Sequence, residues 1–87
     1  MTEGEIYTFK GTRRPIKIIY NAESAFRIKK VGKIWVLFEP VTMRAFGGEV
    51  FRQEVAKLKT TVELYWYKHT EEEILAAEVL YGRNTSS

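Results

Sequence analysis

The chain has 87 residues, which suffices for one folded domain but not for two. It has no cysteine, so disulfides, thiolate metal sites and cysteine nucleophiles are excluded, and it has no apolar run long enough to cross a membrane. Its net charge is +3. We therefore expect a single domain over residues 1–87 that is soluble and cytoplasmic, with no signal peptide and no membrane partner.

The basic residues are concentrated in the N-terminal third. Residues 10–33 contain eight lysines and arginines against one acidic residue, Glu23. This asymmetry favours an anionic partner such as nucleic acid, although an ordinary solvated surface can also carry it. All acidic residues are glutamates, and Asn and Gln are scarce, a pattern typical of hyperthermophile proteins. We therefore predict a thermophilic origin.

The first predicted element is a β-hairpin over residues 5–10 and 15–20. Both runs are rich in β-branched and aromatic residues, and "GTRR" separates them. Pro15 begins the second run, where a missing backbone N–H is tolerated. The loop of this hairpin would display Arg13 and Arg14.

A second hairpin is predicted over residues 26–39. Side chains alternate with a period of two over 26–29 and again over 34–39, as expected of strands with two distinct faces. Gly32 supplies a residue suited to the turn between them. Pro40 then interrupts the strand or moves it to a sheet edge.

The segment from residue 41 to residue 60 fits two interpretations. Gly47 and Gly48 suit a two-residue turn that would extend an all-β meander. Residues 52–59 are mostly helix formers, however, and Phe51, Val55 and Leu58 recur at helical spacing. We favour a short helix over about 49–59.

A strand is predicted over residues 62–67, because "VELYWY" alternates with a period of two. Trp66 would then face one way and Tyr65 and Tyr67 the other. A helix over about 71–81 follows. Thr70 and Glu73 have the spacing of a capping box. Gly82 is a natural residue at which to end this helix, which leaves 83–87 as a frayed polar tail.

The expected fold is therefore α+β: a small, curved antiparallel sheet of about five strands, capable of closing toward a barrel, with a C-terminal helix. The alternative is an all-β meander barrel with one C-terminal helix.

No residue pattern predicts catalysis, a metal site or a cofactor. The three consecutive glutamates at 71–73 fit the first turn of a helix, and consecutive helical residues point about 100° apart, so they cannot converge on one ion. His69 is the only histidine, and no nucleophile stands at a spacing that places it beside this ring. We therefore expect a binding module and not an enzyme.

Basic side chains interleaved with aromatic rings predict sequence-tolerant nucleic-acid binding, with cations on phosphates and rings on bases. Ile19, Trp35 and Leu37 would make the same sheet face partly apolar, which favours the alternative of a protein–protein interaction module or a homodimer. The candidate nucleic-acid-binding residues, of which five lie near two hairpin tips, are Arg13, Arg14, Lys17, Arg27, Lys29, Lys30, Lys33, Tyr65 and Tyr67.

Overall fold

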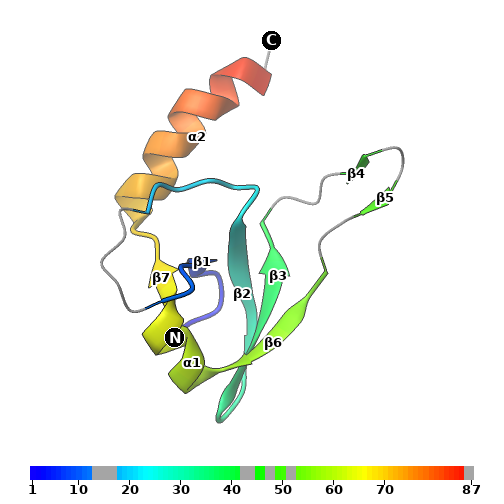
Figure 1. Cartoon of the computed structure of the whole chain (residues 1–87). Helices are drawn as coiled ribbons and strands as arrows, with labels where there is room; N and C mark the ends of the chain where they lie inside the picture. The colour runs from blue at the N-terminus through cyan, green and yellow to red at the C-terminus, as the bar shows by residue number, and fades with distance from the viewer. Residues whose placement is uncertain (13–17, 42–44, 47–48, 51–52, 86–87) are drawn as a thin grey trace.

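The computed structural model describes residues 1–12, 18–41, 45–46, 49–50 and 53–85 (Figure 1). Its centre is one antiparallel sheet of five strands in the order β6-β3-β2-β1-β7. These strands are β1 (Ile6–Phe9), β2 (Ala25–Val31), β3 (Trp35–Pro40), β6 (Val55–Leu58) and β7 (Trp66–Lys68).

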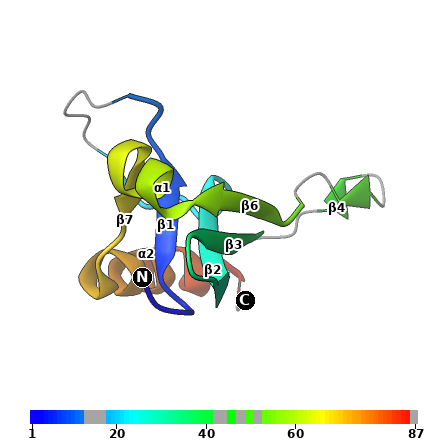
Figure 2. The same cartoon turned by 90° about the horizontal axis from the view of Figure 1, so that it is seen from below.

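The sheet curls into a half-barrel, and the two helices α1 (Lys59–Tyr65) and α2 (Glu71–Thr85) lie on opposite sides of β1 (Figure 2). A separate two-stranded pair, β4 (Ala45–Phe46) and β5 (Glu49–Val50), extends from the sheet. The expectation of an α+β fold with a curved antiparallel sheet and a C-terminal helix is confirmed.

The first predicted hairpin is only half correct. β1 forms, but residues 18–20 are not a strand, and 15–17 lie outside the described residues. Both edges of β1 are occupied by more distant segments, because Tyr7 pairs with Phe26 of β2 and Thr8 pairs with Tyr67 of β7. A local partner strand therefore has no free edge to pair with.

The second predicted hairpin is confirmed as β2 and β3, with Ile28 opposite Phe38. A bulge interrupts the register between Ile28 and Lys30. In the turn, the N–H of Gly32 donates to the carbonyl of Trp35 at 2.8 Å. A Cβ at this position would lie 3.0 Å from the Trp35 carbonyl oxygen, so a larger residue would require the turn to shift slightly.

The predicted helix over 49–59 is wrong, and the β interpretation of this segment holds. Ala45 pairs with Val50 and Phe46 with Glu49, and the predicted turn at Gly47 and Gly48 between them lies outside the described residues. Val55–Leu58 then pairs with β3. The free edge of β3 supplies a ladder of backbone hydrogen bonds, and this tertiary pairing overrides the local helix propensity.

The predicted strand over 62–67 is also wrong at its N-terminal end, where residues 62–65 belong to α1. Only residues 66–68 form a strand. Val62 and Trp66 are buried and Tyr65 is partly buried against the core. These positions are i, i+4 and i+3, so the helical period also brings the bulky apolar groups to one side. Leu64, which the strand would have buried, is 38% exposed.

The C-terminal helix begins where the capping box predicted. The N–H of Glu73 donates to Oγ1 of Thr70 at 3.2 Å, and the N–H of Thr70 donates to Oε1 of Glu73 at 3.0 Å. The predicted end at Gly82 is wrong, because α2 continues to Thr85. Residues 83–85 are therefore helical, while 86–87 lie outside the described residues.

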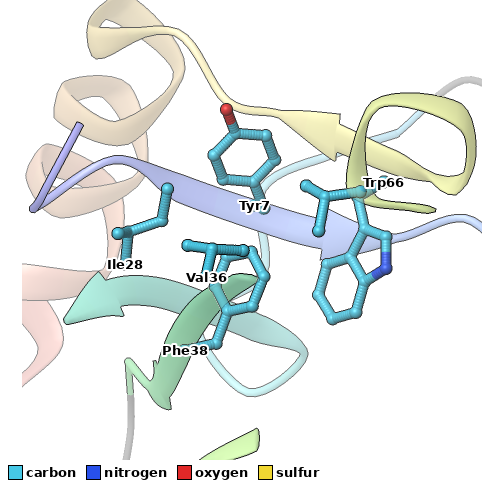
Figure 3. Packing of buried hydrophobic residues seen from close by; sticks show 6 residues of the cluster. Tyr7, Ile28, Val36, Phe38 and Trp66 are labelled. Carbon is cyan, nitrogen blue, oxygen red and sulfur yellow. The ribbon is translucent and has the colours of Figure 1, made fainter. Parts of the chain in front are cut away.

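The core lies between the concave sheet face and α1 (Figure 3). Phe38 stacks in parallel on Trp66 with ring centroids 4.9 Å apart, and Tyr7 meets Phe38 edge-on. Ile28, Val36 and Val62 are almost wholly buried beside them. This aromatic cluster joins β1, β2, β3, β7 and α1 into one unit.

Candidate functional site

The convex face of the sheet is apolar and open over β3 and β6. Val36 and Phe38 point into the core, so the alternate residues Trp35 and Leu37 point to the opposite face. On β6, Leu58 lies opposite Trp35, and Ala56 lies opposite Leu37. Trp35 is 48% exposed and Leu58 38%. We call these four residues the open patch: Trp35, Leu37, Ala56 and Leu58.

The other half of this convex face, over β1 and β7, is covered. Ile6 and Ala25 are buried there, as is Ala77 of α2. Figures 1 and 2 show that α2 starts next to β7, continues away from the sheet and does not approach β6. The convex face therefore consists of one covered half and one open half.

His69 lies in the covered half, at the junction of β7 and α2. Its Nε2 is 2.7 Å from Oγ1 of Thr8, and its Nδ1 is 3.4 Å from Oε2 of Glu73. Because a carboxylate only accepts, Nδ1 donates to Glu73, and Nε2 forms a hydrogen bond with the Thr8 hydroxyl. Tyr20 and Tyr67 both contact the ring edge-on.

The order hydroxyl, imidazole, carboxylate also occurs in catalytic triads. Here the His69 side chain has no exposed surface, so a substrate has no access to the ring. Its contacts instead connect β1, the loop at Tyr20, β7 and α2. Sequence reasoning could not find this cluster, because Thr8 and His69 are 61 residues apart.

Glu73 stabilises the same junction. The backbone N–H of Thr70 lowers the pKa of this carboxyl, and hydrogen bonds from Tyr67, His69 and the Thr70 hydroxyl lower it further, against the opposing effect of burial. The Tyr67 hydroxyl donates to Oε1 of Glu73 at 2.8 Å, and this bond raises the pKa of Tyr67. The capping role expected of this acidic run is confirmed for Glu73. No metal-ligating group of three or more side chains occurs among the described residues.

The predicted basic residues separate into three groups. Arg13, Arg14 and Lys17 lie outside the described residues. Arg27 forms an ion pair with Glu39 at 3.5 Å, and Lys29 forms one with Glu54, which raises the pKa of Lys29. The third group, Lys30 and Lys33, is exposed, and neither makes an ion pair within the described part of the chain.

The chain on either side of the first basic loop lies far from the turn at Gly32. β1 leaves the sheet at Phe9, and the chain re-enters it at Ala25, which pairs with Thr8 at the start of β2. The turn at 32–34 follows the other end of β2, about 20 Å away for a seven-residue strand. Figure 1 shows residues 18–24 at the top of the sheet and this turn at the bottom.

The two predicted tyrosines do not form one platform. Tyr65 belongs to α1 and packs against the core, whereas Tyr67 belongs to β7 and is bonded to Glu73. Sequence reasoning placed Trp35 on the convex face but did not single it out as a binding residue. In the structure the exposed Trp35 ring belongs to β3, whose Leu37 lies opposite Lys30. Trp35 also follows Lys33 by two residues.

A second apolar surface lies on α2. Glu73, Ile74 and Ala77 are its less exposed positions within 71–80, so the opposite side of the helix points outward. That side carries Glu72, Leu75 and Val79, at i, i+3 and i+7, which we call the outer ridge. Leu75 and Val79 are each 59% exposed.

Comparisons with protein-family models, with curated proteins and with solved structures find no match to this chain. Neither α1 nor α2, within their described lengths, is long and apolar enough to cross a membrane.

Proposed function

We propose that the protein is a protein-interaction module and that the open patch receives an apolar surface of its partner. The observation that carries this proposal is the exposure of Trp35 and Leu58 side by side on the convex sheet face. Tryptophan is enriched at the energetically dominant centres of protein interfaces. An apolar cluster in this position is stabilised by removal from water.

The charges around the open patch indicate the chemistry of the partner. Lys30 lies directly opposite Leu37 on the neighbouring strand, and Lys33 lies two residues before Trp35. A partner that fits this surface has an apolar ridge flanked by carboxylates. Such complementarity favours an amphipathic acidic helix over a basic one.

Titration with synthetic helical peptides tests this proposal. One peptide has a Leu/Val ridge flanked by glutamates, a second has the same ridge flanked by lysines, and a third has a serine ridge. We expect the first to bind most tightly and to change Trp35 fluorescence, an effect that Trp35→Phe abolishes and Leu58→Lys weakens. Equal affinity for all three peptides, or binding that Leu58→Lys leaves unchanged, would overturn the proposal.

A second candidate function is sequence-tolerant nucleic-acid binding. Lys30 and Lys33 beside the exposed Trp35 ring combine the two elements of a single-strand platform, a cation for phosphate and a ring for base stacking. Arg13, Arg14 and Lys17 remain part of this proposal. The ion pairs of Arg27 and Lys29 make it the weaker candidate.

Fluorescence anisotropy with labelled single-stranded DNA and RNA tests the second candidate. Binding should weaken steeply as salt rises from about 50 to about 200 mM, and the double variant Lys30→Glu/Lys33→Glu should abolish it. The variant Lys57→Glu, at another exposed lysine, serves as the control. An absence of binding at about 50 mM salt, where electrostatic attraction is strong, rules this candidate out.

A further inference from the structure

We propose that the partner of the open patch is α2 of a second copy of this chain. In the resulting two-fold symmetric dimer, the outer ridge of each protomer packs on the open patch of the other. This inference rests on the proposed function of the open patch and names its occupant.

The first observation is that α2 is apolar on both sides. Ile74 and Ala77 face inward, whereas Leu75, Val79 and Leu80 on the other sides are each more than half exposed. A surface helix of a globular protein normally turns its polar side to water, whereas α2 also exposes large apolar side chains. The outer ridge of α2 therefore has the composition of an interface.

The second observation is charge complementarity between the two apolar surfaces. Residues 71–80 contain four glutamates and no lysine or arginine, and Glu72 belongs to the outer ridge itself. The open patch is flanked by Lys30 and Lys33. One chain thus carries an acidic apolar ridge and a basic apolar patch, so the ridge of each copy can pack on the patch of the other.

Charge also decides between the ways in which two copies can pair. Pairing α2 with α2 would bring Glu71, Glu72 and Glu78 of each copy near those of the other, and pairing patch with patch would bring Lys30 and Lys33 together. Like charges at an interface are destabilising. Only the pairing of ridge with patch sets opposite charges against each other in both contacts.

The geometry of the convex face permits this arrangement. The start of α2 lies beside the β1 and β7 half, and the open patch occupies the β3 and β6 half (Figures 1 and 2). When two such faces meet about a two-fold axis that runs along the boundary between their halves, the covered half of each lies over the open half of the other. A stable interface of usual size buries about 800 Å² per partner, which is roughly an eighth of the 6603 Å² surface of the chain.

Molar mass in solution tests the dimer, measured by light scattering or sedimentation equilibrium over a range of concentrations. We expect the full chain to approach twice 10.2 kDa. Leu75→Lys on the ridge and Trp35→Lys on the patch should each give a monomer. Leu64→Lys, at an exposed leucine of α1 on the other side of the sheet, should remain dimeric. Far-ultraviolet circular dichroism confirms that each variant is folded.

Mixing the two monomeric variants gives the sharper test. A heterodimer of Leu75→Lys and Trp35→Lys keeps one undamaged contact, between the intact ridge of one chain and the intact patch of the other. The mixture should therefore dimerise where neither variant does alone. If Trp35→Lys alone stays dimeric while Leu75→Lys does not, α2 pairs with α2 and the inference is wrong.

Charge reversal provides an independent readout. Glu72→Lys, and separately Lys30→Glu/Lys33→Glu, should each raise the dimer dissociation constant by about twofold to thirtyfold, the range for two symmetric exposed ion pairs. Mixing these two variants should restore the affinity, because both contacts of the heterodimer again set opposite charges together. No restoration would contradict the proposed contact.

Failure of this inference is distinguishable from failure of the proposed function. If the chain is monomeric at every concentration but binds the acidic peptide through Trp35, the proposed dimer is wrong and the proposed interaction function stands. If the monomer binds none of the peptides, both proposals are wrong.

Discussion

Thr8 and His69 meet in the covered half of the sheet, where Oγ1 of the threonine lies 2.7 Å from Nε2 of the histidine. The contact joins the third residue of β1 to the residue that precedes the cap of α2. The imidazole is wholly buried, so every polar atom of this junction has to find its partner within the protein. The position of α2, and with it the direction of the outer ridge, depends on this contact.

Thr8→Val should lower the free energy of unfolding by about 1–3 kcal/mol, because it leaves Nε2 of the buried His69 ring without a hydrogen-bond partner. The replacement keeps the shape of the side chain, so packing changes little. Chemical denaturation monitored by fluorescence measures the effect. Thr60→Val, at an exposed threonine of α1, should change stability much less, and an equal loss in both variants would contradict the structural role of His69.

Glu73→Gln should reduce the acid sensitivity of the protein. The pKa of Glu73 is lower in the folded chain than its ordinary value of 4.5. Its carboxylate therefore contributes its full stabilisation above pH 4.5 and loses it as the pH falls through the lower folded value. The unsubstituted chain should lose stability across this range more steeply than Glu73→Gln. Denaturation midpoints at a series of acidic pH values test this, and parallel curves would show that the carboxylate does not titrate as expected.

Val62→Ala should destabilise the protein by about 2 kcal/mol, since it removes two buried methyl groups from the core. Leu64→Ala, two residues further on, should have little effect because its side chain is partly exposed. Thermal or denaturant unfolding compares the two variants. Similar losses at both positions are what a strand with a period of two would give, and would contradict α1.

Gly32→Ala should lower stability by about 1 kcal/mol, because the new Cβ would lie 3.0 Å from the carbonyl oxygen of Trp35 and the turn would have to shift. The shift should also displace Trp35 and weaken binding of the acidic helical peptide. Lys33→Ala, in the same turn and without this clash, is the matched control for stability. Unchanged stability and binding in Gly32→Ala would show that the turn accommodates a side chain.

Local signals in the sequence predicted the parts of the fold that depend on local interactions. The β2–β3 hairpin needs only Gly32 and two alternating runs, and the start of α2 needs only Thr70 and Glu73 three residues apart. Residues 55–58 and 62–65 fit helix and strand patterns equally well. Their conformations were decided by the free edge of β3 and by the aromatic core, which a local pattern does not contain.

The candidate site was harder to predict for the same reason. A lysine or arginine in the sequence carries no information about its cross-strand neighbour, so the pairing of Arg27 with Glu39 and of Lys29 with Glu54 could not be anticipated. The period of β3 correctly placed Trp35 on the sheet face opposite Val36 and Phe38, but the sequence favoured a buried Trp35, which is wrong because the residue is 48% exposed. Its exposure follows from where α2 ends up, which depends on the contact between Thr8 and His69.

The connection from β6 to β7 explains why the sheet is curled. These two strands follow each other in the sequence but form the two opposite edges of the sheet. Five flat strands would separate those edges by about 19 Å, whereas the seven residues of α1 extend only about 10 Å as a helix. α1 therefore spans the concave side of the sheet, and its short length sets a limit on how flat the sheet can be while both edges stay connected.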